Sequence, residues 1–195
     1  MARILPIRLL HAQAAAEVRP SVEFPSNQFL KHADARCYDW AVRPVLIFDL
    51  DGTLVDSKKD LTTSVNHIRN RFDLPVLAEE EIARFIGNGA LALIRCALAE
   101  KASEINVQAA LQMFLSYYKA HMLDSTDLYP GVRETLDRLS DCRLAVLTNK
   151  PVHFSCAMLD GLGIYKHFVA VYGGNSFDQK KPDPVGVSPT GSGFF

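Results

Sequence analysis

Two carboxylates separated by one residue, Asp49 and Asp51, come directly after the short apolar stretch Val45–Phe48. This stretch of β-forming residues is typical of a buried strand, and Gly52 and Thr53 then turn the chain away. Ligands bind at the carboxyl ends of strands in an open α/β sheet. One carboxylate there can attack while the other transfers protons. The alternative is a strand followed by an ordinary acidic turn, since Asp-Gly is a common turn dipeptide.

Two segments further along the chain carry a hydroxyl and an ammonium group that follow the paired carboxylates in sequence. Arg143–Pro151, with the sequence RLAVLTNKP, predicts a buried strand that ends in the hydroxyl of Thr148. Lys181 lies directly before a proline in Gln179–Pro184. Taken alone, Thr148 is an ordinary strand-end hydroxyl and Lys181 an ordinary solvated charge. Their order behind the paired carboxylates favours a shared functional role over these two ordinary ones.

The ten residues 48–57, FDLDGTLVDS, resemble the first motif of the haloacid dehalogenase superfamily of phosphatases. Residues 143–151 resemble its second motif and residues 179–184 its third, in the expected order. The segments FIGNGA at 85–90 and YPGV at 129–132 are most similar to the phosphoglycolate phosphatase branch of this superfamily.

The resemblance implies a two-step hydrolysis of phosphate monoesters. Asp49 would attack phosphorus to form an aspartyl-phosphate, and Asp51 would protonate the leaving alkoxide and then activate water. Thr148 and the amide of Asn149 would bind phosphate oxygens, while Lys181 would pair with the phosphate and with Asp49. Mg²⁺ is the implied cofactor, held by Asp49 and Asp51, because a hard oxygen site suits this cation.

The alternation of strands with helical stretches predicts an α/β fold with a doubly wound, Rossmann-like parallel sheet. The resemblance implies that this sheet is incomplete. The resemblance adds an inserted all-helical cap. We assign residues 44–60 and 130–184 to the phosphatase core and residues 61–129 to the cap. Within the cap, Gly87 and Asn88 are candidates for substrate specificity, although a plain helix-breaking turn explains them equally well.

Apolar residues at three- and four-residue spacings predict the helices of both parts. The longest of these helices would place Ala110, Met113, Phe114, Tyr117 and His121 on one face, which we expect to pack inside the cap. The full set of predicted helices is Lys59–Phe72, Glu79–Phe85, Leu91–Lys101, Ile105–Met122, Arg133–Ser140 and Phe154–Leu162, and Phe168–Tyr172 is the third predicted parallel strand.

The two ends of the chain do not fit the pattern of the family. Residues 1–16 vaguely resemble a targeting peptide but lack a clean apolar core and cleavage site, and residues 17–43 show no regular period. We interpret residues 1–43 as a poorly ordered leader or as the result of a start assigned too far upstream, and we favour the second slightly over a targeting role. Residues 185–195 form an aberrant tail without Asp or Glu, whereas the family carries a fourth motif with acids that complete the Mg²⁺ site. We therefore expect a truncated chain with a weakened metal site, and a first strand left at an open edge of the sheet.

Composition argues against several classes of partner. The 195 residues carry a net charge of −1, which gives no reason to expect nucleic acid, and no apolar run approaches the length of a membrane span. The four cysteines are scattered and form no CxxC pair, which is typical of reduced thiols in a cytoplasmic protein. The expected partner is a small phosphorylated metabolite, and the sequence leaves the oligomeric state open.

These observations lead to a phosphoglycolate phosphatase-like hydrolase of small phosphate monoesters. A phosphosugar mutase of the same fold is one alternative, because mutases also need an acid at the position of Asp51. A haloacid dehalogenase is less consistent with the sequence, because dehalogenases usually lack that acid. A truncated, non-catalytic remnant is the third alternative, and the tail favours it.

Overall fold

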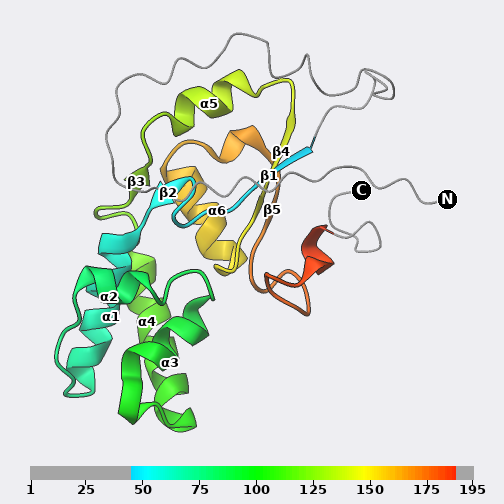
Figure 1. Ribbon diagram of the computed structural model, residues 1–195. Coiled ribbons are helices and arrows are strands. Elements are labelled where there is room, and N and C mark those ends of the chain that lie inside the picture. Colours follow the sequence, from blue (N-terminus) through cyan, green and yellow to red (C-terminus); the bar gives the residue numbers. More distant parts are fainter. Residues whose placement is uncertain (1–44, 188–195) are drawn as a thin grey trace.

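The computed structural model describes residues 45–187 of the chain, drawn in colour in Figure 1. The predicted leader lies outside the described residues, as does the predicted tail from residue 188 onward. The last described residues, Pro184–Val187, form a 3₁₀ turn, η3. Among residues 45–187, none of the helices is long and apolar enough to cross a membrane.

Three parallel strands form the sheet that carries the predicted motifs. They are β1 (Val45–Phe48), β4 (Arg143–Leu147) and β5 (Phe168–Tyr172), in the order β1-β4-β5. Val45 lies opposite Arg143 and Phe48 opposite Val146, so the carboxyl ends of β1 and β4 meet at the same edge. The residues that follow these strands are therefore brought side by side, as the sequence pattern predicted.

Alternate side chains of the sheet face two separate apolar clusters. Leu144 and Val146 pack with the buried residues of α5 (Val132–Arg138) and α6 (Val152–Gly161). The opposite face is covered, within the described residues, by Phe177 and Val187, which pack on Ile47, Ala145 and Leu147. The parallel sheet with its helices confirms the predicted α/β, Rossmann-type fold.

Four helices gather at one end of the molecule, beyond the sheet and away from α5 (Figure 1). Their apolar faces share one buried cluster that includes Val65, Ile82, Ile94 and Phe114. The helices are α1 (Lys58–Arg71), α2 (Glu79–Ala83), α3 (Ala90–Leu98) and α4 (Glu104–His121), with a 3₁₀ turn at Ala99–Lys101, η1. A second 3₁₀ turn, η2 (Tyr165–His167), leads into β5. The exact division of the chain into core and cap stays a prediction.

The two segments that join this helical layer to the sheet pair with each other. β2 (Val55–Asp56) and β3 (Asp127–Leu128) form a short antiparallel ladder. The carboxylate of Asp60, in the first turn of α1, is buried and accepts hydrogen bonds from the backbone of Ser125 and Thr126 at 3.0 and 2.8 Å. The Thr126 hydroxyl donates a third, at 2.8 Å. These bonds fix α1 against the return segment.

The buried face of α4 differs from the one that the sequence predicted. Its buried residues are Val107, Ala110, Phe114 and Tyr118. Met113 is exposed instead, and Tyr117 lies between the rings of His67 and His121, with centroid distances of 4.0 and 4.2 Å. The prediction was wrong for Met113. It also named Tyr117 and omitted the buried Tyr118, because two adjacent tyrosines fit two neighbouring helical faces equally well.

Candidate active site

A hollow that is open to solvent lies between the carboxyl edge of the sheet and the helical layer. On the helical side it is lined mainly by apolar residues, among them Phe85, Ile86, Leu93 and Phe114. On the sheet side the hollow is lined mainly by polar residues. Five of the predicted site residues line the hollow, namely Asp49, Asp51, Thr148 and Asn149 on the sheet side and Gly87 on the helical side. Lys181 contacts the site by its ion pair with Asp49. Asn88 is exposed and does not line the hollow.

Asp49 is the first residue after β1, and its carboxylate has an open position. One oxygen, Oδ1, accepts a hydrogen bond of 2.8 Å from the backbone N–H of Leu50, whose side chain is fully buried. The other, Oδ2, lies 2.9 Å from Nζ of Lys181. The side chains of Asp49 and Lys181 are 37% and 24% exposed. Both groups are therefore partly accessible, and Asp49 lines the hollow.

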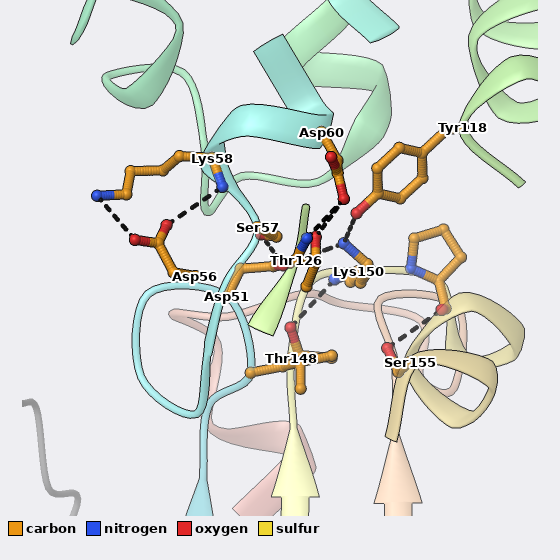
Figure 2. Close-up of polar contacts among 12 residues, drawn as sticks. Asp51, Asp56, Ser57, Lys58, Asp60, Tyr118, Thr126, Thr148, Lys150 and Ser155 are labelled. Atoms are coloured by element: carbon orange, nitrogen blue, oxygen red, sulfur yellow. Dashed lines mark hydrogen bonds and ion pairs between the residues drawn. The ribbon is translucent and has the colours of Figure 1, made fainter. Parts of the chain in front are cut away.

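Asp51 has a more enclosed position, shown in Figure 2. Its Oδ1 accepts a hydrogen bond of 2.6 Å from the hydroxyl of Ser57. Nζ of Lys150 donates to both carboxylate oxygens, at 3.0 and 3.2 Å. The side chains of Lys150 and Asp51 are only 6% and 13% exposed, so this ion pair is largely removed from water.

A tyrosine from the helical layer completes this buried group (Figure 2). Nζ of Lys150 donates to Oη of Tyr118 on α4 at 2.8 Å. Burial raises the pKa of Tyr118 to about 12, so its hydroxyl is neutral at physiological pH. Burial opposes a charge on Lys150, but Asp51 and Tyr118 outweigh it and raise the pKa of the ammonium above its ordinary value. Lys150 is therefore a buried cation.

Sequence reasoning missed Lys150, although it lies within the segment that resembles the second motif. Its position directly after Thr148 and Asn149 at a strand end was the available signal. The contact with Tyr118, 32 residues earlier in the chain, was not readable from local spacing.

Thr148 and Asn149 follow β4 directly. Thr148 is buried, and its hydroxyl oxygen accepts a hydrogen bond of 3.3 Å from the backbone N–H of Lys150. The side chain of Asn149 joins two other segments: its Nδ2 donates to the carbonyl oxygens of Gly87 (2.8 Å) and Lys181 (3.1 Å). Its Oδ1 accepts a hydrogen bond of 3.0 Å from the N–H of Lys181. The predicted phosphate contact through the backbone amide of Asn149 stays a prediction.

Two glycines allow these segments to approach Asn149 closely. A Cβ on Gly89, where φ is +85°, would lie 3.0 Å from the carbonyl oxygen of Asn149. A Cβ on Gly174, after β5, would lie 2.3 Å from the same oxygen. Side chains at either position would push the backbones apart. The loop before α3 and the segment after β5 thus flank Asn149 from two sides.

The donor chemistry at the end of β1 suits the predicted cofactor. Asp49 and Asp51 offer carboxylate and carbonyl oxygens, which are the hard ligands that Mg²⁺ prefers. Within residues 45–187, no three His, Cys, Asp or Glu side chains converge into a metal cluster. Mg²⁺ commonly takes one or two carboxylates together with substrate phosphate and water. The residues present therefore fit this ion, with Asp49 and Asp51 as its predicted ligands.

The same architecture is known from a solved structure, that of a predicted phosphoglycolate phosphatase from Haemophilus somnus 129PT. The TM-score is 0.68 at 34% sequence identity, and the match covers 74% of this chain and 68% of that one. A family model described as haloacid dehalogenase-like hydrolase matches residues 46–190. The chain belongs to this family, which confirms the predicted resemblance.

Curated relatives point to one branch of the family. Phosphoglycolate phosphatase 1 of Pseudomonas aeruginosa is 39% identical over 151 residues, which are 73% of this chain and 55% of that protein. The phosphoglycolate phosphatase of Mesorhizobium japonicum is 35% identical over 153 residues, covering 76% and 67% of the two chains. The chain thus spans little more than half the length of the first relative.

Proposed function

We propose that this chain is a Mg²⁺-dependent phosphatase of small phosphorylated metabolites, with phosphoglycolate as the first substrate to test. The observation that carries the proposal is the meeting of Asp49, Thr148 and Lys181, from three separate segments, at one edge of the sheet. Relatives named phosphoglycolate phosphatase support the choice of substrate. The free thiols of Cys96, Cys142 and Cys156 are consistent with a reaction in the cytoplasm.

In the proposed first step, a carboxylate oxygen of Asp49 forms a bond to phosphorus while the bond from phosphorus to the alcohol oxygen breaks. Asp51, in its protonated form, gives its proton to the departing alkoxide. Lys181 and Thr148 hold the phosphoryl oxygens, where charge builds up in the transition state. Mg²⁺, when bound by Asp49 and Asp51, neutralises further negative charge on the phosphoryl group.

In the second step, Asp51 takes a proton from a water molecule as the water oxygen attacks phosphorus. The bond between phosphorus and Asp49 breaks, which releases inorganic phosphate and restores the carboxylate. Asp51 ends protonated and ready for the next ester. The apolar wall formed by Phe85, Ile86 and Leu93 limits the size of the alcohol that fits the hollow.

Phosphate release from phosphoglycolate by the purified 195-residue chain tests this function, with Mg²⁺ and with the metal removed by EDTA. We expect release that requires Mg²⁺ and is faster for phosphoglycolate than for bulkier phosphosugars. Chloride release from 2-chloropropionate would instead support a dehalogenase, and isomerisation of a phosphosugar would support a mutase. Absence of every one of these reactions would support the non-catalytic remnant.

A further inference from the structure

The side chain of Asn149 joins the loop between α2 and α3 to the backbone of Lys181. Both N–H donors and the oxygen of its side-chain amide form hydrogen bonds. The two N–H groups donate to the carbonyls of Gly87 and Lys181, and the oxygen accepts from the N–H of Lys181. The two bonds to Lys181 fix both the N–H and the carbonyl of that residue. The third bond reaches across to the helical layer. One side chain therefore holds three segments that are distant in sequence.

The three segments meet next to the candidate nucleophile. Lys181 is the residue whose ammonium lies 2.9 Å from Asp49. The loop that carries Gly87 lines the hollow, and Gly89 in the same loop lies against the backbone of Asn149 and near Nζ of Lys180. Movement of this loop away from the sheet would break the hydrogen bond from Asn149 to Gly87. The amide group that holds the backbone of Lys181 would then be less fixed.

We infer that Asn149 is a positioning residue that couples the seating of the α2–α3 loop to the placement of Lys181 at the phosphate site. The inference rests on the proposed function for the identity of the ligand, a phosphoryl group. When the loop lies on the sheet, the Asn149 amide is held from both sides and the Lys181 ammonium is presented to Asp49. When the loop leaves, the backbone of Lys181 loses part of its support, and phosphate binds less tightly. Phosphate binding should in turn hold the loop down.

Asn149→Asp is the sharpest variant, because Asp has nearly the same shape as Asn. It retains the acceptor for the N–H of Lys181 but turns an oxygen toward the carbonyls of Gly87 and Lys181. Two hydrogen bonds are lost and two oxygen–oxygen repulsions appear. Asn70→Asp, an exposed position on α1 outside the hollow, makes the same chemical change and serves as the matched control.

Two measurements on the full 195-residue chain test the coupling. Hydrogen exchange should be at least about tenfold faster in Asn149→Asp both in residues 85–90 and in residues 179–183, with the rest of the sheet unchanged. The affinity for inorganic phosphate in the presence of Mg²⁺ should fall by about tenfold or more. In the wild type, phosphate should slow exchange in residues 85–90, and this protection should be lost in the variant. Asn70→Asp should match the wild type throughout.

Other outcomes overturn the inference. Faster exchange in only one of the two segments, or in neither, means that Asn149 does not couple them. Faster exchange throughout the chain, with a lower midpoint of thermal unfolding, means a purely structural role. A wild-type chain that binds no phosphate contradicts the proposed function, and the exchange of the two segments then decides the inference alone. If Asn149→Asp does not fold, Asn149→Ala, which removes the same bonds without repulsion, is judged by the same criteria.

Discussion

The site contains two carboxylate–lysine pairs with nearly equal distances and very different surroundings. Asp49 and Lys181 lie 2.9 Å apart with 37% and 24% of their side chains exposed. Asp51 and Lys150 lie 3.0 Å apart with 13% and 6% exposed, and Tyr118 closes the group from α4. The first pair opens to the hollow, while the second connects the sheet to the helical layer.

Exposure decides what each pair can contribute. An ion pair in contact with water adds about 0–1 kcal/mol to stability. Asp49 and Lys181 can therefore give up their mutual contact for contacts with a phosphoryl group at little cost. Removing one partner of a buried ion pair leaves the other charge uncompensated, which costs about 3–5 kcal/mol. The open pair is thus suited to the attack on phosphorus, and the buried pair to holding α4 and the proton-transferring Asp51 in place.

The largest expected effect comes from the open pair and concerns activity alone. Asn at position 49 keeps the size of the side chain but cannot attack phosphorus. Turnover of Asp49→Asn should therefore fall by several orders of magnitude, while the free energy of unfolding changes by less than about 1 kcal/mol. Phosphate release and urea unfolding on the same preparation check both parts. Asp178→Asn, an exposed change in the segment after β5, is the control. Retained turnover in Asp49→Asn would place the nucleophile elsewhere.

The next prediction is that the two lysines contribute differently to the free energy of unfolding. Lys150→Met leaves Asp51 and the hydroxyl of Tyr118 without their partner, so we expect the free energy of unfolding to fall by about 3–5 kcal/mol. Lys181→Met should lower it by about 1 kcal/mol or less. Chemical denaturation of both variants measures the difference. Equal losses for the two lysines would contradict the distinction drawn between the open and the buried pair.

A smaller effect tests whether Tyr118 acts through Lys150. Tyr118→Phe removes only the hydroxyl and keeps the ring stacked on Phe114 at 5.4 Å. We expect a loss of about 1 kcal/mol in the free energy of unfolding in the wild type, and a clearly smaller loss when Lys150 is already Met. The double-mutant cycle measures this coupling. Additive losses would show that the hydroxyl and the ammonium do not depend on each other.

The last effect concerns alkaline pH and appears only above the physiological range. The pKa of Tyr118 is about 12 in the folded chain against an ordinary value of 10.0, so the unfolded phenol loses its proton first. Its stabilising contribution is complete below pH 10 and is lost as pH rises toward 12. The pKa of Lys150 is also raised in the folded chain, so its contribution to stability is likewise lost as the pH rises above the ordinary value of 10.5. Unfolding measured from pH 9 to 12 should show a decline that is less steep in Tyr118→Phe.

Much of the open side of the site was predictable from the sequence. The apolar run before Asp49 and the one before Thr148 predicted parallel strands, and the ends of parallel strands meet at one edge. Lys181 was placed by its motif, and the structure brings it to Asp49. None of this requires knowledge of how the helical layer packs.

The buried side could not be predicted in the same way. Lys150 is buried because Tyr118 of α4 covers it, and that contact depends on which of two adjacent tyrosines faces inward. The bonds from Asn149 to Gly87 and Lys181 likewise depend on two loops whose path no periodic pattern sets. Asn88 was predicted, together with Gly87, to point from the cap toward the substrate, and it is exposed and does not line the hollow.

The most direct test of the account is to trap the phosphorylated protein and locate the modified residue. Phosphoglycolate and Mg²⁺ are mixed with the full chain, the reaction is stopped in acid, and the acyl phosphate is reduced with borohydride before tandem mass spectrometry. We expect borohydride to reduce the acyl carbon of phosphorylated Asp49, the carboxylate of the open pair, so that phosphate leaves and homoserine is found at this position, and we expect no such conversion in Asp49→Asn. Phosphorylation of Asp51, or turnover without any modified carboxylate, would contradict it.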